Sequence, residues 1–176
     1  QNPNYKRHDE IGWNYRLSEF SAAVTLAQLE KLDEIVERRI EVANMFLDVI
    51  DETNCGFLIP QLQPEGYKNS YWSLALLFEE EKCGMSWQDF RKRYVNNGGD
   101  GIYGAWSVPY LEPVMAEGNF KKMNPHIYEN ISYPKGLCPV AEAVQQKIMQ
   151  LKTNYRNLEL ARQKADIFKQ TILEVM

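Results

Sequence analysis

The segment that begins at Gly12 carries an amide and a guanidinium two residues apart, at Asn14 and Arg16, directly before Ser18. An asparagine side chain offers two N–H donors and one acceptor, and an arginine offers a rigid fork of donors that suits a phosphate. Residues two apart in an extended segment point to the same side, so these two groups could converge on one anion. On residue chemistry alone, the simpler interpretation is favoured: a loop asparagine that satisfies its own backbone and a surface arginine.

A helical region follows this segment directly. Ser18 is a good N-cap residue, and apolar residues then recur at spacings of three and four as far as Leu32. After a shift of phase near Asp33, a second apolar stripe continues to Ile50. The pattern predicts either two helices or one bent helix, packed against the rest of the protein through the apolar stripe.

The remaining sequence alternates between strand-like and helix-like patterns. The expected elements are a strand over 70–78, a short helix over 87–95 capped by Ser86, a strand over 102–108, an irregular stretch over 110–130, a helix over 140–151 and a last helix over 158–175. This order predicts an α+β fold in which a small sheet is flanked by long helices.

Length and charge exclude several classes of protein. The chain has 176 residues, enough for one domain with a core, and a net charge of −4, which argues against an electrostatic nucleic-acid binder. No long apolar run or signal-peptide pattern is present, so we expect no membrane association and a cytoplasmic location. The first ten residues are polar, lack periodicity and lack an initiator Met, which favours a segment of a longer protein.

Cysteine and histidine residues give no sign of a cross-linked or metal-binding site. Cys55, Cys83 and Cys138 are odd in number and widely scattered, which fits a reducing compartment. His8 and His126 have no Cys or carboxylate at a ligand spacing, so the sequence predicts no metal site.

The run 12–23, GWNYRLSEFSAA, resembles the DegT/StrS-type aminotransferases, which typically read G-x-N-x-R-M-S-E-x-x-A-A at this point. The similarity continues through the sequence LAQLEKL at 26–32 and ERR at 37–39. It is weaker in three later segments, at 87–90, 97–102 and 133–140.

The resemblance implies the C-terminal small domain of a fold-type-I pyridoxal phosphate (PLP) enzyme over residues 17–176. Residues 1–16 would be a leading segment and interface loop, and the large PLP-binding domain would be absent. Such enzymes pass an amino group, usually from L-glutamate, to a keto sugar attached to a nucleotide. Such enzymes are homodimers. For this protein, the resemblance implies a dimer interface formed by the large domain and the Gly12–Ser18 loop.

The same resemblance implies roles for individual residues. In the family, the asparagine of the loop reaches across the dimer interface to the phosphate of the neighbour's cofactor, a role that falls on Asn14. Arg16 matches the nearby arginine and is expected to assist in binding the anion. Tyr103, Trp106 and Tyr110 lie where the family's strand and loop border the substrate.

The aromatic candidates also have a simpler interpretation. Many members of the family carry a histidine in the substrate loop, whereas this chain reads Tyr110-Leu111-Glu112-Pro113. Core or surface packing therefore remains the alternative for each of the three aromatic residues.

No residue of the chain is assigned as catalytic. The family's Schiff-base lysine lies tens of residues before the loop, whereas Lys6 is only eight residues from Asn14 and lacks the surrounding motif. We therefore expect the chain alone to be inactive. Two alternatives stay open: a non-catalytic interaction or dimerisation module with the same fold, and a PLP-dependent dehydratase relative, in which the lysine is replaced, often by histidine.

Overall fold

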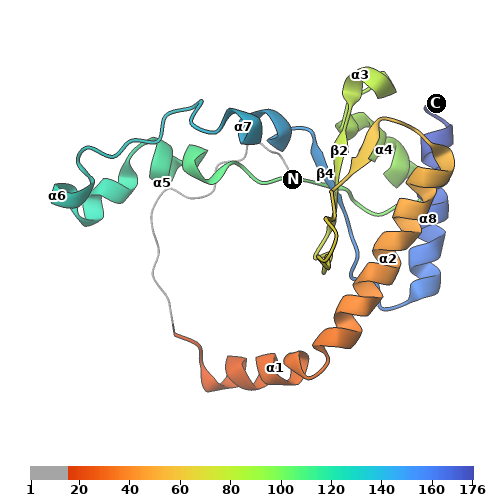
Figure 1. Ribbon diagram of the computed structural model, residues 1–176, viewed down its shortest axis with the longest axis horizontal. Helices are drawn as coiled ribbons and strands as arrows, with labels where there is room; N and C mark the ends of the chain where they lie inside the picture. The colour runs from red at the N-terminus through yellow and green to blue at the C-terminus, as the bar shows by residue number, and fades with distance from the viewer. Residues whose placement is uncertain (1–15) are drawn as a thin grey trace. The chain divides into compact units, whose positions relative to one another are not determined.

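The structure is a computed structural model that describes residues 16–176 (Figure 1). The described part forms two compact units. We call residues 19–103 with 147–176 the sheet unit, and residues 104–146 with 16–18 the insert unit. The predictions for Asn14, Lys6 and His8 concern residues outside the described range.

The sheet unit contains a four-stranded sheet with the order β1-β2-β4-β3. Its strands are β1 (Leu58–Pro60), β2 (Leu74–Phe78), β3 (Tyr103–Gly104) and β4 (Ile148–Leu151). β2 pairs antiparallel with both β1 and β4, and Leu76 lies opposite Met149. Alternate residues of β2 and β4 are buried, as expected for strands with one face against the core.

Three longer helices supply the other side of the core: α2 (Leu32–Thr53), α4 (Trp87–Asn96) and α8 (Leu158–Leu173). The buried residues of α2 lie in its C-terminal part, from Val42 on, and α2 packs against α8 (Figure 1). Ser86 caps α4 as predicted, accepting a hydrogen bond from the Asp89 backbone at 3.2 Å, and Asn157 caps α8 in the same way. The short helix α3 (Glu80–Cys83) follows β2.

Aromatic rings fill the centre of the sheet unit. The buried ring of Phe168 lies edge-on to Phe46, Phe90 and Tyr94, with centroid distances of 5.6, 5.8 and 5.5 Å. Edge-to-face packing at these distances is the favoured arrangement of aromatic rings. The ring of Phe168 therefore joins α8 to α2 and α4 in one core.

The first helical region consists of two helices, α1 (Glu19–Leu29) and α2, as one of the two sequence interpretations held. The expected packing of the apolar stripe is seen for α2 but not for α1, none of whose side chains is buried among the described residues. Phe20 is 82% exposed and Leu29 59%. In Figure 1, α1 runs away from the sheet, and no described element covers its apolar residues.

The helix expected over 140–151 is confirmed only in its first half. Helix α7 covers only Pro139–Gln145, and β4 follows it. The apolar residues of β4 alternate, so that Met149 and Leu151 face the core, and a short apolar run cannot be assigned to helix or strand by periodicity alone. Residues 148–151 form a strand because they pair with β2.

Two strands are shorter than the sequence predicts. The strand expected over 70–78 begins only at Leu74, because Tyr71 adopts a positive φ of 44° that interrupts an extended chain. The strand expected over 102–108 is limited to β3. Strand β1 was not predicted, since it has three residues and ends in Pro60.

The insert unit consists of short helices separated by prolines and glycines. They are η1 (Pro109–Leu111), α5 (Pro113–Ala116), η2 (Asn119–Met123), α6 (Pro125–Tyr128) and α7. Phe120 packs against Tyr128 and Tyr133 at centroid distances of 5.5 Å. Across residues 16–176, no helix combines the length and the apolar character needed to cross a membrane.

Candidate functional site

The predicted site residues fall in both units. Arg16 and Trp106 are exposed on the insert unit, where Tyr110 is buried. Tyr103 lies on the sheet unit and is 50% exposed. Within the described part of the chain, a ligand could therefore reach three of these side chains: Arg16, Tyr103 and Trp106.

Tyr110 is engaged within the insert unit. Its hydroxyl donates to the Glu142 carboxylate and accepts a hydrogen bond from the Cys138 backbone at 2.9 Å. The Glu142 carboxylate also accepts from the Gly136 backbone at 2.5 Å. Loss of hydration and the hydrogen bond to Glu142 raise the pKa of Tyr110, while the same hydroxyl and Gly136 lower the pKa of Glu142. Tyr110 therefore fixes the segment that leads into α7.

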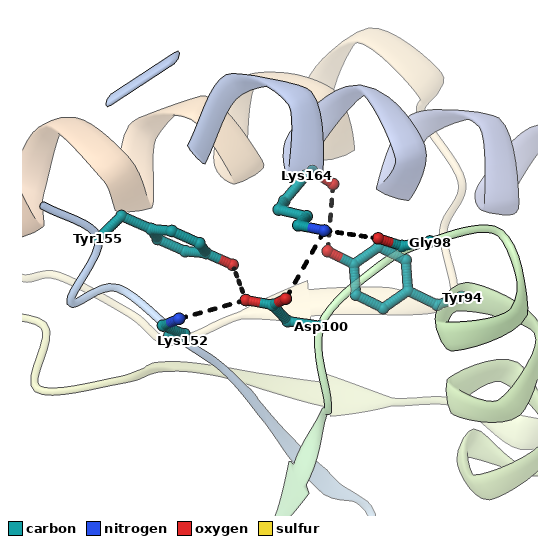
Figure 2. A network of polar contacts seen from close by, with 6 residues as sticks. All are labelled: Tyr94, Gly98, Asp100, Lys152, Tyr155 and Lys164. Atoms are coloured by element: carbon teal, nitrogen blue, oxygen red, sulfur yellow. Dashed lines mark hydrogen bonds and ion pairs between the residues drawn. The ribbon is translucent and has the colours of Figure 1, made fainter. Parts of the chain in front are cut away.

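Three residues before Tyr103 in the sequence, Asp100 is the centre of a polar network in the sheet unit (Figure 2). The Asp100 carboxylate accepts a hydrogen bond from the Tyr155 hydroxyl at 2.7 Å and lies 3.4 Å from the Lys152 ammonium. Its other oxygen lies 3.7 Å from the Lys164 ammonium, which donates to the Gly98 carbonyl at 2.6 Å. One carboxylate thus links the turn after α4 to α8 and to the connection between β4 and α8.

The glycines of this turn allow its backbone to lie close to the Tyr94 ring. Gly98 has a φ of 96°, which favours glycine, and a Cβ at Gly99 would lie 2.4 Å from the Tyr94 ring. The Tyr94 hydroxyl donates to the Lys164 carbonyl at 3.1 Å, so the ring under the turn is itself held in place. The turn therefore lies directly on the core.

Charges in the network favour an ionised aspartate. Partial burial alone would raise the pKa of Asp100, but the Tyr155 hydrogen bond and the two ammonium groups outweigh it and lower the pKa. Burial is the largest cause of the raised pKa of Tyr155, followed by Asp100, and Tyr103 contributes as well. The charges around Asp100 thus reach as far as the residues that flank this turn.

A second feature of the sheet unit lies just before β2. The carbonyl of Tyr71, the residue with positive φ, accepts a hydrogen bond from the buried Thr153 hydroxyl at 2.6 Å. Arg39 of α2 donates to the Trp72 carbonyl at 2.9 Å. These bonds hold a strained peptide in place, and the Trp72 side chain that follows is 74% exposed.

The sequence interpretation did not select the Asp100 network or Trp72. The signal that could have indicated Asp100 is its place as the one non-glycine residue among 98–101. Its partners lie far along the chain, at Lys152, Tyr155 and Lys164, and only the fold brings them together.

The comparison with protein families decides the relationship. The model of the DegT/DnrJ/EryC1/StrS aminotransferase family matches residues 1–165, nearly the whole chain. The chain belongs to this family. The family membership and the α+β small-domain fold expected from the sequence are both confirmed.

Sequence and structure comparisons place particular relatives beside this DegT/DnrJ/EryC1/StrS family member. A GDP-perosamine synthase of Vibrio cholerae is 25% identical over 139 residues, which are 74% of this chain and 36% of that protein. The chain therefore spans little more than a third of the length of this relative.

Solved structures share the fold at low sequence identity. DesV of S. venezuelae, in complex with a ketimine intermediate, superposes with a TM-score of 0.67 at 18% identity, over 98% of this chain and 41% of DesV. An E. coli GDP-4-keto-6-deoxy-D-mannose-3-dehydratase with bound hydrated PLP gives 0.61 at 17% identity, over 92% of this chain and 36% of the enzyme. Both DesV and this dehydratase thus share the architecture of the chain.

The described residues do not by themselves fit a complete PLP site. Two open grooves among these residues lie on α8 and α2 and are lined mostly by charged residues. Lys164, the ion-paired lysine with the least exposed side chain, is engaged by Asp100 and the Gly98 carbonyl. The part of this family member described here therefore offers no enclosed lysine for a Schiff base.

Proposed function

We propose that this chain is the C-terminal part of a PLP-dependent aminotransferase that transfers an amino group from L-glutamate to a keto sugar nucleotide. The observation that carries the proposal is the family match over residues 1–165, which includes the G-x-N-x-R run at Gly12 to Arg16. The product would serve the synthesis of amino sugars, in the cytoplasm.

The exposed helix α1 supports the presence of a further domain in the working enzyme. Phe20, Val24 and Leu29 are 82%, 52% and 59% exposed, on a helix that has no buried residue. Apolar residues distributed in this way are ordinarily enclosed by other protein. A PLP-binding domain packed over α1 would remove this surface from water.

The chain's own contribution is binding and orientation. Asn14 and Arg16 would hold the phosphate group of a cofactor in the neighbouring subunit of a homodimer, through an amide and a guanidinium. Tyr103 and Trp106 would border the sugar nucleotide, and Tyr110 would hold the adjacent segment in place through Glu142. When bound, PLP supplies the electron sink of the reaction.

Replacing Asn14 by alanine in the full-length protein should weaken PLP binding about tenfold, because one hydrogen bond to a charged phosphate is lost. PLP retention is measured by absorbance during dialysis, with the fold checked by circular dichroism. Asn44→Ala, at an exposed position of α2, is the matched control. Equal PLP affinity in the Asn14 and Asn44 variants would refute the assigned role.

The 176-residue chain alone should form no Schiff base and show no amino transfer, since it lacks the family's lysine motif. PLP is added to the isolated chain and the absorbance band of an aldimine is sought; its appearance would contradict the assignment. With the full-length protein, glutamate-dependent amination of a keto sugar nucleotide supports the proposal. Loss of a sugar hydroxyl instead would favour a dehydratase, and the absence of both reactions a non-catalytic interaction module.

A further inference from the structure

We propose that Asp100 is a positioning residue, which holds strand β3 so that Tyr103 can contact the sugar nucleotide. This inference rests on the proposed function and on Tyr103 as a substrate-binding residue. It adds a residue that touches no substrate itself but sets the orientation of one that does.

The start of the turn before β3 is held to α4 by two backbone hydrogen bonds, from Gly98 to the Val95 carbonyl at 3.0 Å and from Gly99 to the Tyr94 carbonyl at 2.8 Å. Among residues 98–101 only Asp100 carries a side chain beyond hydrogen, so it is the side chain through which the turn can be tied to other segments. Glycine-rich turns have many accessible conformations, and holding one of them requires external contacts. Asp100 provides these contacts to three residues: Lys152, Tyr155 and Lys164.

These three contacts come from parts of the sheet unit that are themselves fixed. Tyr155 is 4% exposed, and the Lys152 ammonium lies over its ring at 4.4 Å from the centroid. Lys164 lies in α8, whose core side is buried against α2 and α4. Figure 2 shows the Asp100 carboxylate between these groups, and we infer that these contacts hold the turn against the core.

The turn leads directly to Tyr103. Ile102 is fully buried, and its carbonyl accepts a hydrogen bond from Arg91 at 2.9 Å. With Asp100 held on one side of Ile102 and the Arg91 bond on the other, the direction in which the chain enters β3 is determined. Tyr103 then lies on the last strand of the sheet and is half exposed.

Asp100→Asn is a sharp test because asparagine has nearly the same shape and can still accept the Tyr155 hydrogen bond. It removes the negative charge that neutralises Lys152 and Lys164. In the full-length protein, we expect the KM for the sugar nucleotide to rise about tenfold while kcat and the KM for the amino donor change less than about twofold. Tyr155→Phe, which deletes only one hydroxyl, should raise the same KM by a smaller factor.

A double-mutant cycle separates positioning from general loss of stability. If Asp100 acts through Tyr103, Asp100→Asn should cause no further rise in KM when Tyr103 is already alanine. Glu52→Gln is the matched control. It breaks an exposed ion pair with Lys169, at 2.7 Å, which lies in α8 like Lys164. This variant should leave every KM unchanged. Additive effects of the Asp100 and Tyr103 substitutions would overturn the proposal.

Hydrogen exchange tests, independently of activity, whether Asp100 holds strand β3 in place. Amides of residues 101–104 should exchange faster in Asp100→Asn than in the wild type and in Glu52→Gln. Unchanged exchange would overturn the proposal, as would faster exchange with an unchanged KM in the variant. Absence of amino transfer by the wild-type protein would refute the proposed function, and the exchange measurement would still report whether Asp100 holds β3.

Discussion

Replacing Phe168 by alanine is expected to lower the free energy of unfolding of the chain by about 3–5 kcal/mol. The Phe168 side chain is fully buried and contacts the rings of Phe46, Phe90 and Tyr94. These rings come from two other helices, so collapse around the missing ring would require helices to move, and a cavity should remain. The measurement is urea denaturation followed by far-UV circular dichroism.

Phe20→Ala is the control for this prediction. It removes the same atoms from α1, where the side chain is 82% exposed, and should change the free energy of unfolding by less than about 0.5 kcal/mol. Equal losses in the two variants would contradict the placement of Phe168 at the centre of the core.

Gly99→Ala should lower the free energy of unfolding by about 2–3 kcal/mol, towards the upper end of the range for an overpacked core. The added methyl group would lie 2.4 Å from the Tyr94 ring. This ring cannot simply move aside, because its hydroxyl is bonded to the Lys164 carbonyl and its other side packs on Phe168. Thermal unfolding of the chain measures the loss.

Gly101→Ala makes the same chemical change two residues further along. Its methyl group would meet nothing closer than an Arg91 nitrogen at 3.9 Å. It should therefore be neutral, or stabilising by up to about 1 kcal/mol through the reduced entropy of the unfolded chain. If Gly99→Ala proved as harmless as Gly101→Ala, the close packing of the turn on Tyr94 would be refuted.

The helices of the sheet unit could be predicted from sequence because their signals are local. α4 begins after a Ser86 cap, and α8 carries a sustained apolar stripe. β4 could not be predicted, since its four residues follow α7 closely and take their strand conformation from pairing with β2. Likewise, the exposure of α1 is a property of its surroundings, and its sequence is typical of a buried helix.

The candidate site divides in a similar way. The resemblance pointed to Asn14 and Arg16 because a short motif carries them, and those roles remain predictions. Sequence alone could not indicate the partners of Asp100, since Lys152 and Tyr155 reach it only after β4 has entered the sheet. Tyr110 stays a predicted substrate contact, and nothing in the sequence indicates that its hydroxyl bonds Glu142 and the Cys138 backbone.

The position of β4 has a consequence for the synthesis of the chain on the ribosome. β4 lies between β2 and β3, yet the insert unit's residues 104–146 are translated before it. Until β4 and then α8 leave the ribosome, β2 has an unpaired edge, and the rings of α2 and α4 lack their contacts with Phe168. Such non-local contacts slow folding, and the waiting nascent chain exposes surfaces that aggregate or bind chaperones. Completion of this fold is therefore deferred until the last part of the chain is made.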